Sequence, residues 1–195
     1  MRQTDSHSDW HELYETEIGV ADSEITSKNF HVDESSVICD IYALPSHNHQ
    51  TFYGKIVQEH GLYKIIFAKA IQSSMWFSDP IYMYTFEEAK RFEDHPMKRG
   101  RIICRAKLCE KSFVDHLLFN VWKLLDTQPD SAVQPSIDAV FTAIRMYERG
   151  SVSKCIFYTD AEKLDFRASA DNFEAVKFFN KLHLTIEKII GIGEN

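Results

Sequence analysis

The stretch that decides the fold is TFYGKIVQEHGLYKIIFAKAI, residues 51–71. Two runs rich in β-branched and aromatic residues, 51–58 and 62–71, flank the tripeptide Glu59-His60-Gly61. Glycine readily adopts the positive φ angle that a tight hairpin turn requires. The pattern therefore predicts two antiparallel strands joined by a β-hairpin turn at Gly61.

Three other segments have strand patterns. Apolar residues between about 24 and 43 predict one or two strands, interrupted near Asp33, and residues 153–159 predict another. In residues 101–109 apolar side chains alternate with mostly basic ones. This alternation is typical of a strand with one buried and one solvated face.

Helices are expected mainly in the second half of the chain. Capping pairs three residues apart and apolar periodicity predict helices over about 85–95, 112–125, 136–148 and 171–190, and a short helix near residue 9. Gly150 is expected to end the third of these. The helix over 112–125 is apolar around most of its circumference, so we expect it to be covered on more than one side.

The composition and the order of these elements predict the fold class. The chain has 195 residues, of which 44% are hydrophobic and 13% aromatic, enough for one substantial core. Because strands and helices do not alternate regularly, the sequence predicts a single α+β domain. We expect a mainly antiparallel sheet that contains the β-hairpin, with about four helices packed on one face.

No segment has the length of apolar sequence that a membrane-spanning helix needs, and the N-terminal residues lead into acidic positions rather than an apolar stretch. A cytoplasmic protein with no membrane association is the expectation. The four cysteines include no Cys-x-x-Cys pair, so reduced and mostly buried thiols are expected.

The net charge of −7 is concentrated at the N-terminus. Residues 1–35 contain nine acids against Arg2 and Lys28, whereas residues 36–195 contain twenty residues of each sign. This asymmetry is typical of an interaction segment or a solvated face. We therefore expect an acidic N-terminal arm, residues 1–35, followed by a globular α+β domain, residues 36–195.

No motif for nucleophilic catalysis or for phosphate binding in a glycine-rich loop is present. His47 and His49 would project from the same side of an extended segment and so could chelate one metal ion, but a polar loop beside Pro45 is the preferred explanation. No catalytic residue, cofactor or metal ligand is assigned. A catalytic site assembled from distant positions stays open.

The sequence predicts a non-enzymatic protein-binding or inhibitory protein, similar in kind to immunity proteins or anti-defence inhibitors. The acidic arm would contact a partner protein with a basic surface, and an aromatic segment would add apolar anchors, since Trp and Tyr are enriched at interfaces. The candidate partner-binding residues are Glu12, Glu15, Glu17, Trp76, Phe77 and Tyr84.

The alternative is an enzyme or binding module for a phosphorylated ligand or nucleic acid. Residues 98–111 contain six bases and one acid, and alternation places Arg101, Arg105 and Lys107 on one outward strand face. Such a stripe is able to contact phosphates. The negative net charge of the chain favours the protein-binding interpretation, so nucleic acid is not the expected partner. A solvated sheet face, or a counter-surface for the acidic arm, also explains the stripe.

Overall fold

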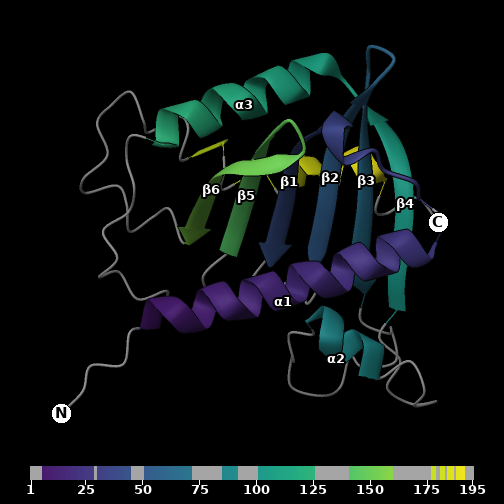
Figure 1. Ribbon diagram of the computed structural model, residues 1–195, viewed down its shortest axis with the longest axis vertical. Helices are drawn as coiled ribbons and strands as arrows, with labels where there is room; N and C mark the ends of the chain where they lie inside the picture. The colour runs from purple at the N-terminus through teal and green to yellow at the C-terminus, as the bar shows by residue number, and fades with distance from the viewer. Residues whose placement is uncertain are drawn as a thin grey trace.

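The computed structural model describes residues 6–28, 30–44, 51–71, 85–91, 101–125 and 141–159, and parts of a terminal helix at 177–178, 181–182, 184–186 and 188–191. Within these residues six strands form one antiparallel sheet, in the order β4-β3-β2-β1-β5-β6 (Figure 1). The strands are β1 (Val37–Leu44), β2 (Phe52–Glu59), β3 (Leu62–Ile71), β4 (Arg101–Cys109), β5 (Phe141–Glu148) and β6 (Ser151–Thr159). The predicted α+β class with an antiparallel sheet is confirmed.

The hairpin predicted from residues 51–71 is present as β2 and β3. His60 and Gly61 form its two-residue turn, with φ angles of 53° and 78°. Two successive positive φ angles give the turn a backbone twist that matches the twist of the flanking strands. The turn thereby fixes the register in which Glu59 lies opposite Leu62.

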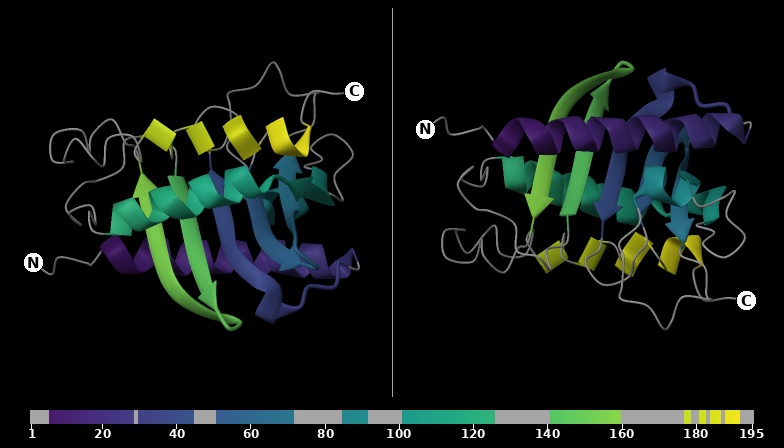
Figure 2. Two further views of the ribbon diagram at one scale, coloured as in Figure 1. Left: turned by 90° about the horizontal axis from the view of Figure 1, so that it is seen from above. Right: turned by 90° about the horizontal axis from the view of Figure 1, so that it is seen from below.

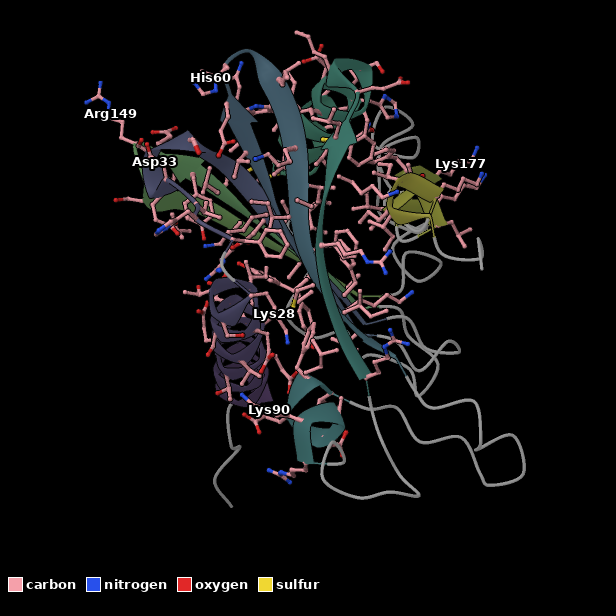
Figure 3. All side chains as sticks on the ribbon, turned by 90° about the vertical axis from the view of Figure 1, so that its right-hand side faces the viewer. Lys28, Asp33, His60, Lys90, Arg149 and Lys177 are labelled. Carbon is pink, nitrogen blue, oxygen red and sulfur yellow. The ribbon has the colours of Figure 1, made fainter. Side chains whose placement is uncertain are left out.

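The predicted helix over 136–148 is wrong for residues 141–148, which form β5; residues 136–140 lie outside the described part. Arg149 and Gly150, with φ angles of 52° and 80°, join β5 to β6 in a second hairpin turn of the same kind (Figure 3, which labels His60 and Arg149). Ile144 and Tyr147 are compatible with helical spacing, but the segment pairs with β1 on one side and with β6 on the other, which makes it a strand. Gly150 therefore acts as a turn residue between strands rather than as a helix end.

Helices cover both faces of the sheet, so the expectation of helices on one face is wrong. On one side lie α1 (Ser6–Ser27) and α2 (Phe86–Arg91), and on the other lie α3 (Lys111–Leu125) and the terminal helix (Figure 2). Each side has its own apolar core, the first around Tyr53 and Phe86 and the second around Leu117 and Leu182. The physical reason is that residues 52–57 of β2 are all buried, and a strand that is buried on both faces needs cover on both.

The segment between residues 24 and 36 differs from the strand prediction. Ile18, Ala21 and Ile25 recur at the spacing of one helical face, and all three are buried against the sheet as part of α1. A short 3₁₀ turn, Glu34–Ser36, leads from there into β1 and is capped by the side chain of Asp33. The division of the chain at residue 35 stays a prediction.

The capping box predicted at Thr85 and Glu88 is confirmed. The backbone N–H of Glu88 donates to Thr85 Oγ1 at 3.2 Å, and the backbone N–H of Thr85 donates to Glu88 Oε2 at 2.9 Å. Each side chain satisfies a donor that the first turn of α2 leaves open. Among the helices described here, none is both long enough and apolar enough to span a membrane.

Candidate functional site

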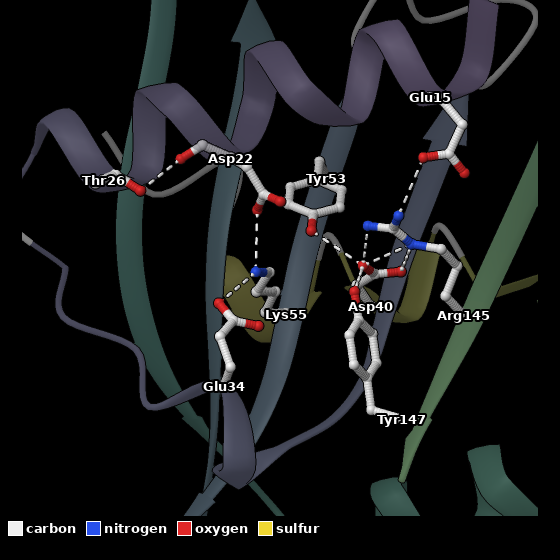
Figure 4. Close-up of polar contacts among 9 residues, drawn as sticks. All are labelled: Glu15, Asp22, Thr26, Glu34, Asp40, Tyr53, Lys55, Arg145 and Tyr147. Carbon is white, nitrogen blue, oxygen red and sulfur yellow. Dashed lines mark hydrogen bonds and ion pairs between the residues drawn. The ribbon is translucent and has the colours of Figure 1, made fainter. Parts of the chain in front are cut away.

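A polar cluster lies between α1 and the sheet, centred on Asp40 of β1 (Figure 4). Asp40 is 0% exposed and lies directly across from Arg145 of β5. Arg145 Nε donates to Asp40 Oδ1 at 3.0 Å, and Arg145 Nη2 donates to Oδ2. A fork of this kind is the strongest arrangement available between a guanidinium and a carboxylate.

Two tyrosines complete the coordination of the Asp40 carboxylate. Tyr53 Oη on β2 donates to Asp40 Oδ2 at 3.1 Å, and Tyr147 Oη on β5 donates to the same oxygen at 2.8 Å. Burial, followed by the negative charge of Asp40, raises the pKa of both phenols well above the usual value. Both tyrosines therefore stay protonated and act as donors, and the carboxylate has its acceptor positions occupied.

The arm contributes acids to the edge of this cluster. Glu15 of α1 is 54% exposed at its side chain and accepts from Arg145 Nη1 at 3.3 Å. Two turns further along the helix, Asp22 pairs with Lys55 of β2 at 3.3 Å, and Lys55 also donates to Glu34 at 3.1 Å. Burial raises the pKa of Asp22, and the charge of Lys55 partly opposes that effect.

These contacts show where the described arm acids are neutralised within the molecule. Glu15 pairs with Arg145, Asp22 with Lys55, and Glu24 with Lys90 of α2 at 3.0 Å. The bases of these pairs lie on β2, β5 and α2 rather than on the basic strand, which the sequence offered as a counter-surface for the arm. The cluster therefore anchors α1 to the sheet and leaves the carboxylates of Glu15 and Glu34 partly accessible at its rim, with side chains 54% and 57% exposed.

Glu17 is buried, at 2% exposure, which differs from the expectation that it contacts a partner. Its carboxylate accepts from the backbone N–H of Phe86 at 3.0 Å, at the first residue of α2. Burial, together with nearby Glu87 and Glu88, raises the pKa of Glu17, while the hydrogen bonds from Phe86 and Thr85 oppose the shift. Glu17 therefore joins α1 to α2 instead of facing solvent.

This placement predicts a pH effect that Glu17→Gln removes. A carboxyl group whose pKa is raised on folding adds stability below its unfolded pKa, and that contribution is lost as the pH rises through the folded value. The glutamine amide oxygen still accepts from Phe86 but does not titrate. In thermal melts between about pH 4 and pH 7, the melting temperature of the variant relative to the natural protein should therefore rise with pH. If the melting temperature of the variant minus that of the natural protein stays constant or falls as the pH rises, the raised pKa of Glu17 is contradicted.

The other expected partner-binding residues are placed as follows. Glu12 lies within α1, but its side chain is outside the described residues, and Trp76, Phe77 and Tyr84 lie outside them altogether, as do His47 and His49. Their roles stay predictions. Glu15 is exposed and remains compatible with a contact to a partner.

The basic residues of the alternative interpretation lie on β4, the strand predicted from their alternation. Arg101, Arg105 and Lys107 are all exposed, and within the described part of the chain none of them forms an ion pair. The strand is exposed on its other face as well, where Leu108 is 67% exposed. The structure brings these bases together on one face but does not combine them with the acids of the arm.

An exposed aromatic pair lies on α3. Val114, Leu117 and Val121 of this helix face the core and are fully buried. A second side is covered by the terminal helix, where His116 meets Phe178 edge to face with ring centroids 4.5 Å apart. On a third side, Phe119 is 57% exposed and Trp122 is 56% exposed.

Of the described thiols, Cys39 is buried, and Cys104 and Cys109 are partly buried. Burial raises the pKa of Cys104 and of Cys109 to about 11, and it raises the pKa of Cys39 further. All three are protonated at neutral pH, which makes them weak nucleophiles. In the residues that the structure describes, no three His, Cys, Asp or Glu side chains are grouped so as to hold a metal ion.

Sequence reasoning missed Asp40, Arg145, Phe119 and Trp122. Asp40 stands between Cys39 and Ile41 within an apolar run, and a lone charge in a buried strand requires a partner. The sequence therefore contained a signal for Asp40, but that signal did not identify Arg145 as the partner. No protein-family model matches this chain, and a search of curated proteins finds no match.

Proposed function

We propose that this chain is a non-enzymatic protein-binding or inhibitory protein, in the manner of immunity proteins or anti-defence inhibitors. The observation that supports this proposal is the exposed aromatic pair of α3. Trp and Phe bury large areas at little entropic cost and dominate the energetics of many protein interfaces. Neighbouring exposed apolar side chains of this size form the kind of contiguous patch that marks interaction sites on proteins.

The surroundings of the pair suit a specific contact. Phe119 and Trp122 are three residues apart, so they are neighbours on one face of the helix. The ammonium group of Lys123 lies 4.7 Å from the centroid of the Phe119 ring, which restricts the ring. A restricted aromatic side chain loses less conformational entropy when a partner binds.

The exposed Glu15 of α1 adds a second component on the opposite face of the sheet. The exposed carboxylate of Glu15 and the acids that precede it would attract a partner with a basic surface. Complementary charge chiefly raises the rate of association, whereas buried aromatic anchors chiefly lower the rate of dissociation. The two features thus support one kind of partner, a protein with basic and apolar regions.

The test compares the natural protein with Phe119→Ser/Trp122→Ser as bait in purification from the native source. The protein retained in stoichiometric amount is identified by mass spectrometry, purified, and titrated by calorimetry. Each aromatic residue, if it is an interface hot spot, should weaken binding by about thirtyfold or more when truncated. The melting temperature should change little, since both side chains are already exposed.

Val152→Ser on β6 is the matched control, because Val152 is also an exposed apolar residue, at 47%. It should leave the affinity unchanged. Equal affinity for the double variant and the natural protein would remove α3 from the interface. A natural protein that retains nucleotide or nucleic acid, and no protein, would favour the phosphorylated-ligand alternative instead.

A further inference from the structure

The strand β4 lies at one end of the sheet formed by the described strands. Among the described strands, its nine residues pair only with β3, from Arg101 opposite Ile71 to Cys109 opposite Tyr63. Figure 3 views the molecule from this side, with β4 nearest the viewer and the helices on either side of the sheet. Alternate residues of such a strand direct their N–H and C=O groups away from the sheet.

Both faces of β4 are open over its second half. The consecutive residues Arg105, Ala106, Lys107 and Leu108 are all exposed. Because successive side chains of a strand point to opposite faces, this run is accessible from above and from below as well as along its edge. An added strand would therefore find room for its side chains on both faces.

The two faces differ in chemistry. One face carries Arg101, Arg105 and Lys107, which are exposed and form no ion pair among the described residues. The other carries Leu108, 67% exposed, and next to it Leu62 of β3, 60% exposed. The register places Leu108 opposite Lys64, two residues along the strand from Leu62, so the two leucines are diagonal neighbours.

We propose that β4 is a docking edge for an extended acidic segment of a partner protein, which adds to the sheet as a further strand. Its acidic side chains would lie beside the bases on one face, and its alternate apolar side chains would lie beside Leu62 and Leu108 on the other. Strand addition combines main-chain hydrogen bonds, which give affinity, with side-chain alternation, which gives specificity. This surface is separate from the α3 pair and does not depend on it.

A second copy of this chain does not fit the same edge. In an antiparallel pair of two β4 strands centred on Arg105, the two Arg105 side chains would lie directly opposite each other. Like charges directly opposite each other destabilise a strand pair. Basic residues on an edge strand thus oppose pairing between copies, and they favour a strand of opposite charge.

Nucleic acid is disfavoured by two features of the molecule. The net charge of −7 repels a polyanion at long range. The exposed leucines on the reverse face offer nothing to a phosphate backbone, whereas they suit the alternate side chains of a peptide strand. A uridine decamer is nevertheless included in the test as the competing ligand.

The test uses fluorescein-labelled peptides and fluorescence anisotropy. The probe is a capped peptide, Thr-Glu-Val-Glu-Val-Glu-Val-Thr; one control has Lys in place of each Glu, and another has Pro in place of the central Val. We expect the acidic peptide to bind, the lysine peptide not to bind, and the proline peptide to bind about tenfold more weakly, since proline removes a main-chain donor and disrupts strand pairing. Bound peptide should slow amide hydrogen exchange in β4.

The variant Arg105→Glu/Lys107→Glu should reverse the binding preference. It should no longer bind the acidic peptide and should bind the lysine peptide instead. Lys177→Glu/Lys181→Glu makes the same change in net charge on the exposed side of the terminal helix (Figure 3, which labels Lys177) and should bind like the natural protein. If the charge-reversed variant has a reduced melting temperature, the neutral variant Arg105→Gln/Lys107→Gln is used in its place. Phe119→Ser/Trp122→Ser should bind the peptide normally, which separates this proposal from the one for α3.

Three results would overturn the proposal. The first is failure of the acidic peptide to bind. The second is equal binding of the acidic and proline peptides without protection of β4, because attraction between charges alone would then explain the affinity. The third is tighter binding of the uridine decamer that depends on Arg105 and Lys107, which would identify the strand as a phosphate-contacting surface.

Discussion

Asp40→Asn should lower the free energy of unfolding by about 3 to 5 kcal/mol, the usual cost of removing one partner from a buried ion pair. The side chains of asparagine and aspartate have nearly the same volume, so no cavity forms. The loss reflects the missing charge and the amide group, which cannot accept the hydrogen bonds that one Asp40 oxygen accepts. Arg145 is left as a buried cation at 9% exposure, and among the described residues Glu15 at the rim is its remaining ion-pair partner. Denaturation in urea, followed by circular dichroism, measures the change.

The matched control is Asp115→Asn, which breaks the pair between Lys111 and Asp115 on the exposed side of α3. Exposed pairs between neighbouring helical turns contribute little to stability, so this variant should unfold at nearly the same urea concentration as the natural protein. Adding Arg145→Met to Asp40→Asn should restore part of the loss, because the unpaired charge is then gone. Equal effects of Asp40→Asn and Asp115→Asn would show that the cluster is not a buried charge pair.

Leu182→Ala should cost about 2 to 5 kcal/mol, the range for truncating a buried leucine. Leu182 lies in the described part of the terminal helix, is 0% exposed, and packs in the same core as Leu117 of α3. The cost combines lost burial with a cavity that two packed helices and a sheet can only partly close.

Leu184→Ala provides the control, because the same substitution two residues away removes a side chain that is 46% exposed. It should cost much less than Leu182→Ala in the same urea titration. Similar losses for the two variants would mean that the terminal helix presents a different face to the sheet.

The sequence predicted those elements whose local signals agree with one another. Gly61 between two β-rich runs indicated a hairpin, and Thr85 with Glu88 indicated the start of a helix; both signals act within a few residues. The strand containing Arg105 was also predicted, because alternation over nine residues leaves one plausible structure. These elements needed no knowledge of distant contacts.

Predictions failed where the outcome depended on a distant partner. The apolar positions of residues 141–148 do not alternate, yet their pairing with β1, about a hundred residues earlier in the chain, makes them a strand. That helices cover both faces of the sheet became clear only from the folded β2, where even the charged Lys55 is buried, beneath α1. The site was hidden for the same reason, since Asp40 and Arg145 meet only across that strand pair.

The position of the β1–β5 pair also bears on the order of folding. The hairpins β2–β3 and β5–β6 close short loops at small entropic cost, whereas joining β1 to β5 closes a loop in which Arg145 meets a partner 105 residues away. Contacts of such long range form slowly, so the β1–β5 pair is expected to form after both hairpins. The helix α1 crosses the β1–β5 pair and forms ion pairs with Lys55 of β2 on one side and with Arg145 of β5 on the other. It thereby holds the two halves of the finished sheet together.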